Sequence, residues 1–166
     1  AFWWELFTLF LGYKNMKRLI KFKNNPKIIS TATVCGPKEA KGNLAVFIDK
    51  KIDDDYNNEK TFELAERKML SYTVKRVIEK GGLKSKEVSA YIGGDLLNQI
   101  ISSSFSAREF NLPFLGVYSA CSTMTECMLL AACLVDGFYM ENVVCATGSH
   151  FSTAERQYRY PLEQGT

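Results

Sequence analysis

The sequence predicts an α/β fold built on a mainly parallel sheet flanked by helices. Apolar, β-rich segments alternate with helical segments from residue 27 to residue 147, which is the pattern of a parallel sheet with right-handed crossovers. The clearest helical segment, residues 61–80, carries apolar residues at spacings of three and four, as an amphipathic helix does. In such folds, ligands bind at the carboxyl ends of the strands.

Composition excludes several classes of protein. A chain of 166 residues with 46% hydrophobic and 23% charged residues is long and apolar enough for one globular domain. The net charge is only +3, and no nucleic-acid-binding motif accompanies the basic stretch at 14–27, so we expect no nucleic-acid partner.

The five cysteines indicate a reducing compartment without structural disulfides or zinc. Their number is odd, no pair has zinc-knuckle spacing, and the chain has one histidine. By default, three of them pack in apolar segments: Cys127, Cys133 and Cys145.

The first stretch differs in composition from the rest. Residues 1–13 are strongly apolar and aromatic but shorter than the ~20 residues of a membrane helix. Charges follow this run instead of preceding it, unlike a signal peptide. An interfacial anchor is one interpretation. We expect instead that Met16 is the true start, that residues 1–15 are upstream or artefactual, and that 16–166 form the domain.

The first part of the domain is expected to hold one strand, a polar loop and the best-defined helix. The strand is residues 27–34, followed by a turn at 35–39. The acidic run 53–55 in the loop is read as solvated, because an isolated run has no defined metal-ligand geometry. Helix 61–80 ends at Gly81.

The remaining elements follow in regular alternation. A short turn lies at 85–87, capped by Ser85. Strands and helices are then expected at residues 88–93 (strand), 100–110 (helix), 112–117 (strand), 123–135 (helix) and 142–147 (strand).

Cys121 is the leading candidate for chemistry. It follows a strand and a small-residue turn, and Ser122 and Thr123 are good N-cap residues for the helix behind it, which Gly137 ends. The free N–H groups and positive dipole end of that helix would stabilise a thiolate or hold an anion. The alternative is a small residue buried at a strand–helix junction.

Three segments that leave strand ends are expected to converge, namely residues 94–99, 121–123 and 148–156. Asp95 and Asn98 offer polar groups there, although Asp95 could instead cap the next helix. His150, the only histidine, is a candidate base or anion donor, or a loop residue bonded to backbone. Arg156 could clamp a carboxylate with its neighbour Arg159, or pair with Glu155 in a structural corner.

Several motifs together resemble the thiolase-fold superfamily, and most closely a sporulation family of spore-forming Firmicutes within it. The resemblance runs from Met16 to the end of the chain. The motifs are Cys35-Gly-Pro-Lys-Glu39, Ala65-Glu-Arg67, Gly94-Asp-Leu-Leu-Asn-Gln99, Leu112-Pro-Phe-Leu115, Ala120-Cys-Ser-Thr123, Leu134-Val-Asp-Gly137, Ser149-His150, Thr153-Ala-Glu-Arg-Gln157 and Arg159-Tyr-Pro161.

This resemblance implies the first half only of a thiolase-like fold, a mainly parallel sheet with a mixed edge. It also implies a non-catalytic scaffold that binds dipicolinic acid, or its calcium chelate, for uptake into the developing spore. Cys121 would then be a vestigial nucleophile. The ligand-binding residues would be Asp95, Asn98, Ser122, Thr123, His150 and Arg156.

The same resemblance implies partners and a location. These are membrane proteins of the same operon, a second copy in a homodimer when full length, and a cytoplasmic position or a peripheral one at the spore inner membrane. No cofactor is implied apart from calcium carried as the chelate.

Two alternatives remain open. One is an acyltransferase of the β-ketoacyl synthase or thiolase type with Cys121 as acyl acceptor. In those enzymes the catalytic histidine and the second cysteine or histidine come from a second half, which lies beyond Thr166. The other alternative is a non-functional gene fragment.

Overall fold

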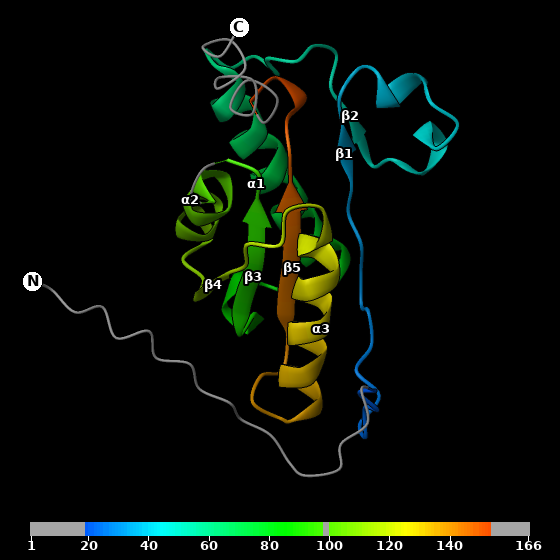
Figure 1. Ribbon diagram of the computed structural model, residues 1–166, viewed down its shortest axis with the longest axis vertical. Coiled ribbons are helices and arrows are strands. Elements are labelled where there is room, and N and C mark those ends of the chain that lie inside the picture. The colour runs from blue at the N-terminus through cyan, green and yellow to red at the C-terminus, as the bar shows by residue number, and fades with distance from the viewer. Residues whose placement is uncertain (1–18, 98–99, 154–166) are drawn as a thin grey trace, which may run out of the picture.

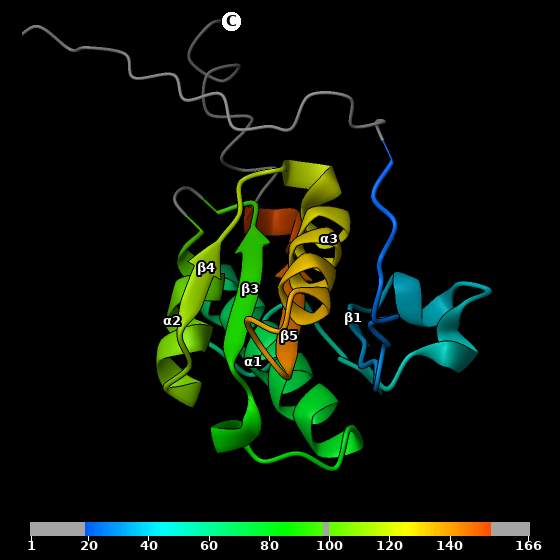
Figure 2. The same cartoon turned by 90° about the horizontal axis from the view of Figure 1, so that it is seen from below.

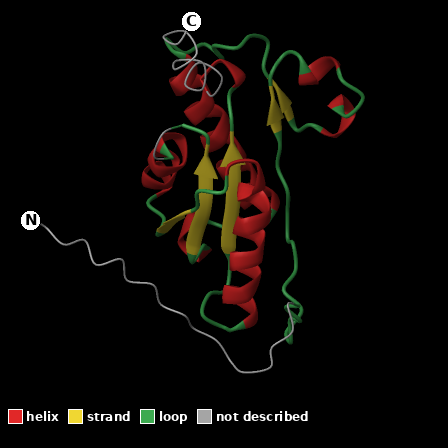
Figure 3. Ribbon diagram, in the orientation of Figure 1, coloured by secondary structure: helices red, strands yellow, loops and turns green. Residues whose placement is uncertain are grey.

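The computed structural model describes residues 19–97 and 100–153, and in them it shows an α/β fold. Its main sheet has three strands, β3 (Ala90–Asp95), β4 (Phe114–Gly116) and β5 (Val143–Gly148), in the order β4-β3-β5 (Figures 1 and 3). Both pairings are parallel. The predicted parallel sheet is therefore confirmed, and the expected mixed edge is not found among the described strands.

Helices cover both faces of this sheet. Helices α1 (Phe62–Lys80) and α2 (Ile101–Phe110) pack on one face, and α3 (Thr123–Asp136) packs on the other (Figure 2). Because side chains alternate along a strand, Tyr91 of β3 joins the α1–α2 core and its neighbour Ile92 joins the α3 core. Both side chains are fully buried.

Helix α1 follows the prediction closely. The side chain of Thr61, the N-cap residue, accepts a hydrogen bond from the Leu64 N–H at 3.3 Å, and Gly81 is the C-cap residue. Its buried face includes Leu70, Val74 and Ile78, at spacings of four. This row of side chains packs α1 on β5 and shares one core cluster with Tyr91 of β3.

The first predicted strand is wrong in extent. Only Val34–Cys35 is a strand (β1), paired in parallel with Lys50–Lys51 (β2), and residues 27–33 have no strand assignment. Ile28 and Ile29 are 71% and 61% exposed. A β-rich composition predicts side chains that suit a sheet, but a strand also needs a neighbouring backbone to pair with.

Smaller differences concern the segments around the strands. Two short 3₁₀ helices, Glu39–Lys41 and Ala45–Phe47, interrupt the stretch expected to be turn and polar loop, and a third at Ser85–Glu87 matches the expected turn. Strand β3 runs on through Gly94 and Asp95, which were expected to be a loop or the entrance of a helix, because its pairing with β5 continues to that point. In the described part of the chain, no helix is both long and apolar enough to span a bilayer.

Candidate functional site

The carboxyl ends of the three parallel strands lie at one edge of the sheet. Asp95 at the end of β3 pairs in register with Gly148 at the end of β5, and Gly116 ends β4 beside Gly93. The turns after all three strands therefore leave from this edge. The predicted convergence is confirmed for those parts of the three segments that the structure describes.

Gly94 brings the turn before α3 against β3. A Cβ atom added at Gly94 would lie 2.3 Å from the carbonyl oxygen of Val117 and 2.9 Å from Cγ2 of Thr123. These distances are too short for any side chain, so only glycine allows this approach. We call residues 117–126, which hold Cys121, the α3 corner of the site.

Cys121 lies in a short 3₁₀ turn, Ala120–Ser122, directly before α3, and it is exposed. Ala120 has a φ of 46°, in the left-handed region, which costs about 1–2 kcal/mol for a residue with a Cβ atom. The turn is therefore sharp and strained, and it presents the thiol to solvent. Cys121 is therefore not buried at the strand–helix junction, which was the alternative interpretation.

The hydroxyls of Ser122 and Thr123 do not cap α3. Ser122 occupies the N-cap position, but its hydroxyl donates to the carbonyl of Ser119 at 2.8 Å. The Thr123 hydroxyl donates to the carbonyl of Ala120 at 2.8 Å. The expected side-chain cap is thus wrong, because both hydroxyls turn back to carbonyls three residues earlier.

The first turn of α3 therefore has no side-chain cap, although the backbone N–H of Thr123 already donates to the carbonyl of Ala120. The N–H groups that follow Thr123 and the helix dipole suit an anion. The Glu126 carboxylate also lies in this turn and accepts a hydrogen bond from the Ser119 hydroxyl. An anionic ligand would have to share the helix end with that charge.

Asp95 serves the start of α2. Its carboxylate oxygens accept the backbone N–H groups of Leu97 at 3.0 Å and Ser103 at 2.7 Å, and the residue is 8% exposed. Ile100, at the N-cap position of α2, has no side-chain acceptor to offer. This geometry is that of the helix-capping alternative.

His150 is held by both ring nitrogens. Nε2 lies 2.7 Å from the carbonyl oxygen of Asp55, so this nitrogen carries the proton and donates. Nδ1 accepts the N–H of Ser152 at 3.2 Å, and the residue is 6% exposed. With both nitrogens occupied, the ring matches the alternative of a loop residue bonded to backbone.

Glu66 of α1 is a site residue that sequence reasoning missed. It is 2% exposed, and its Oε2 accepts the backbone N–H of His150 at 3.2 Å and lies 2.6 Å from Oγ1 of Thr153. Burial raises the pKa of this carboxyl, and the nearby Asp95 charge adds to the shift. We call Glu66, His150, Ser152 and Thr153 the α1 corner of the site.

A signal for Glu66 was present in the sequence. It lies four residues before Leu70, in the row of buried side chains that continues through Val74 and Ile78. A glutamate in such a row is rarely buried without partners, so it marks a place where other polar groups must meet it.

The three cysteines predicted to pack in apolar segments differ in exposure. Burial raises the pKa of the Cys127 thiol to about 12 and that of Cys145 to about 11, in agreement with their predicted packing role. Cys133 is exposed, so its predicted burial is wrong. It lies on α3, whose solvent side also carries Met128, Leu129 and Leu130 at about two-fifths exposure.

The acidic run 53–55 forms a local turn. The Asp54 carboxylate accepts the N–H groups of Tyr56 at 2.7 Å and Asn57 at 2.9 Å. Among the residues that the structure describes, no group of three or more histidine, cysteine, aspartate or glutamate side chains could hold a metal ion. The predicted ligand residues Asn98 and Arg156 lie outside the described residues.

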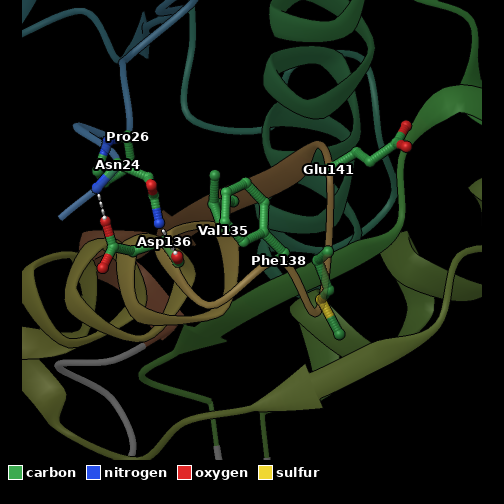
Figure 4. A pocket seen from close by; sticks show the side chains of 7 residues that line it. Asn24, Pro26, Val135, Asp136, Phe138 and Glu141 are labelled. Carbon is green, nitrogen blue, oxygen red and sulfur yellow. Dashed lines mark hydrogen bonds between the residues drawn. The ribbon is translucent and has the colours of Figure 1, made fainter. Parts of the chain in front are cut away.

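An open hollow of about 410 Å³ lies at the other end of α3 (Figure 4). The Asp136 carboxylate there accepts the backbone N–H groups of Lys23 and Asn24 and ties the N-terminal arm to the helix. Phe138 and Glu141 also line the hollow. Since Cys121 precedes α3 and Asp136 ends it, this hollow is not part of the candidate site.

Comparison with known proteins gives a match over most of the chain. The family described as Stage V sporulation protein AD matches residues 16–166. The Stage V sporulation protein AD of Bacillus subtilis (strain 168) is 40% identical over 136 residues, which are 82% of this chain and 40% of that protein. The chain thus spans about two-fifths of the length of that relative.

Proposed function

Since this chain belongs to the stage V sporulation protein AD family, we propose that its protein acts in sporulation by binding dipicolinic acid for uptake into the developing spore. The role is that of a non-catalytic, thiolase-like scaffold. Family membership supports the sporulation role. The ligand follows from the resemblance of the site motifs and from the chemistry of the α3 corner.

The observation that carries the ligand proposal is the uncapped start of α3 at the carboxyl edge of a parallel sheet. Dipicolinate is a small planar dianion, and free helix N–H groups bind carboxylates well. Arg156 is proposed to supply the opposing positive charge, with Asn98 completing the polar contacts. The calcium chelate, if it is the form carried, is cargo and not a resident cofactor.

A titration tests this proposal on the protein as its gene encodes it. We expect calorimetry to detect dipicolinate binding and pyridine-2-carboxylate, with one carboxylate fewer, to bind at least about tenfold more weakly. Arg156→Gln should weaken dipicolinate binding by a similar factor, and the matched control Arg76→Gln, on the exposed side of α1, should not. No binding with or without calcium would refute the proposal.

Acyl transfer is the second candidate function, and the exposure of Cys121 on a strained turn favours it. If it holds, incubation with acyl-coenzyme A donors leaves a thioester on Cys121 that Cys121→Ser abolishes. Cys133→Ser is the matched control, because Cys133 is also exposed. Turnover of acyl thioesters without dipicolinate affinity would replace the first proposal with this one.

We also propose that the protein forms a homodimer and works at the spore inner membrane with membrane proteins of its operon. In the described part, β4 pairs on one side only, and Leu115 on it is 45% exposed. An open strand edge with apolar side chains suits a protein interface. Sedimentation analysis of the protein with Leu115→Lys tests it, and an unchanged dimer would exclude this edge.

A further inference from the structure

The α1 corner contains a conflict of hydrogen-bond donors and acceptors at Thr153. Its Oγ1 lies 2.6 Å from Oε2 of Glu66 and 2.8 Å from the carbonyl oxygen of His150. A carbonyl oxygen can only accept, and an ionised carboxylate can only accept. The hydroxyl has one proton, so it cannot donate to both neighbours.

A proton on Glu66 resolves the conflict. The carboxylic acid then donates from Oε2 to Thr153, and Thr153 donates its own proton to the carbonyl of His150. The His150 N–H still donates to Oε2, at 3.2 Å. Every short contact in the corner then has one donor and one acceptor.

Two further observations agree with an uncharged Glu66. Its Oε1 is buried and has no hydrogen-bond partner among the described residues, which costs much more for a carboxylate than for a neutral acid. Among the described residues, the charge of Asp95 on β3 raises the pKa of Glu66 further, and burial is the largest cause of the shift. On helix α2, the Ser102 hydroxyl acts in the other direction and lowers the pKa of Glu66, but by less than burial raises it.

We propose that Glu66 is a positioning residue that acts as a protonated carboxylic acid, donating to Thr153 and so fixing the turn after β5 at the edge of the sheet. The turn carries His150, whose side chain ties it to the loop at Asp55. A second consequence rests on the proposed function: a neutral Glu66 leaves this corner of the site without a charge that would repel a dianion.

The variants Glu66→Gln and Glu66→Ala test the protonation state. The glutamine amide nitrogen can donate to Thr153 as the acid does, but it cannot accept the His150 N–H, so Glu66→Gln should fold and be only slightly less stable than the wild type near pH 5. Glu66→Ala should lose stability at all pH values. Glu79→Gln is the matched control, on the exposed face of the same helix.

The pH dependence has a definite sign. Because the folded-state pKa of Glu66 is raised, the stabilisation is complete below the ordinary value of 4.5 and is lost as pH rises through the folded-state pKa. The denaturation midpoint of the wild type should therefore fall relative to Glu66→Gln as pH rises from about 5 to about 8. An ionised Glu66 predicts the reverse, with Glu66→Gln the less stable protein at about pH 8.

Infrared spectroscopy gives an independent readout. The wild type in deuterium oxide near neutral pH should show the carbonyl stretch of a protonated carboxylic acid, and Glu66→Gln should remove it. Absence of that band from the wild type would overturn the proposal. Retention of the band in Glu66→Gln would assign it to another carboxyl and would also count against the proposal.

Ligand binding is tested separately from the protonation state of Glu66. If the proposed function holds, Glu66→Gln should bind dipicolinate within about twofold of the wild type, and Glu66→Ala about tenfold more weakly. Failure of the wild type to bind refutes the proposed function and leaves the infrared and stability results intact. Binding that is equal in all three proteins would refute the positioning role alone.

Discussion

The two corners of the site edge differ in how their polar groups are satisfied. In the α1 corner, Glu66 and His150 are buried, and each makes hydrogen bonds across the fold. In the α3 corner, Cys121 is exposed and the start of α3 lacks a side-chain cap. A closed network of this kind fixes geometry, whereas a helix start without a side-chain cap, beside an exposed thiol, suits an anion.

Within this one edge of the sheet, the α1 corner stabilises the fold, whereas the α3 corner is the part suited to a ligand. Four residues expected to contact a ligand use their side-chain polar atoms on the protein itself, namely Asp95, Ser122, Thr123 and His150. The groups left for a ligand are backbone N–H groups and the Cys121 thiol. If the proposed function holds, ligand recognition at this edge depends on the start of α3 and on residues outside the described ranges.

The largest expected effect is a contrast in thiol reactivity along α3. Cys121 is exposed, while Cys127 is fully buried with a pKa raised to about 12. At about pH 8 the thiolate fraction of Cys127 is on the order of one in ten thousand. Alkylation followed by mass spectrometry should therefore label Cys121 at least about a thousandfold faster than Cys127.

Cys133 serves as the control for this contrast, since it is exposed on the same helix and should also react. If Cys121 reacts as slowly as Cys127 while Cys133 reacts quickly, the α3 corner is covered in the protein in solution. The distinction between an open and a closed corner would then fail.

The next effect concerns the contact that seats the α3 corner on β3. Gly94→Ala places a Cβ atom 2.3 Å from the Val117 carbonyl oxygen, a backbone atom that cannot move alone. We expect the free energy of unfolding to fall by about 3 kcal/mol or more, measured by urea denaturation. The control Gly36→Ala meets no atom within 4 Å and should change stability by less than about 1 kcal/mol.

A small loss in Gly94→Ala would contradict the close packing of the two segments. If Gly94→Ala folds, it also tests whether the two corners of the site respond separately. Dipicolinate binding should weaken with the displaced α3 corner, while the infrared signature of Glu66 in the α1 corner should remain.

Sequence reasoning found the elements well because their signals are local. The spacing of apolar residues and the cap at Thr61 fixed α1 to within one residue of its start. The strand prediction for residues 27–33 was wrong for the opposite reason. Strand pairing depends on a distant backbone, which the composition of a segment does not describe.

The site was only partly predictable for a similar reason. Cys121 was found because strand, turn and helix signals meet there within a few residues. Glu66 was missed because its partners, His150 and Thr153, lie more than eighty residues away in the sequence. Residue type also could not tell whether the Thr123 hydroxyl would face a ligand or, as found, the carbonyl of Ala120.

The smallest expected effect lies at the strained turn itself. Ala120 has a φ of 46°, which glycine adopts without the Cβ clash, so Ala120→Gly relieves about 1–2 kcal/mol of strain. Glycine also gains entropy in the unfolded chain, which offsets up to about 1 kcal/mol of that relief. The free energy of unfolding should therefore rise by about 0.5–1 kcal/mol.

The control is Ala45→Gly, at a position where φ is not positive. Its free energy of unfolding should instead fall by up to about 1 kcal/mol. A loss in both variants would mean that Ala120 leaves the left-handed region in solution, and the α3 corner would then lack the sharp turn that presents Cys121.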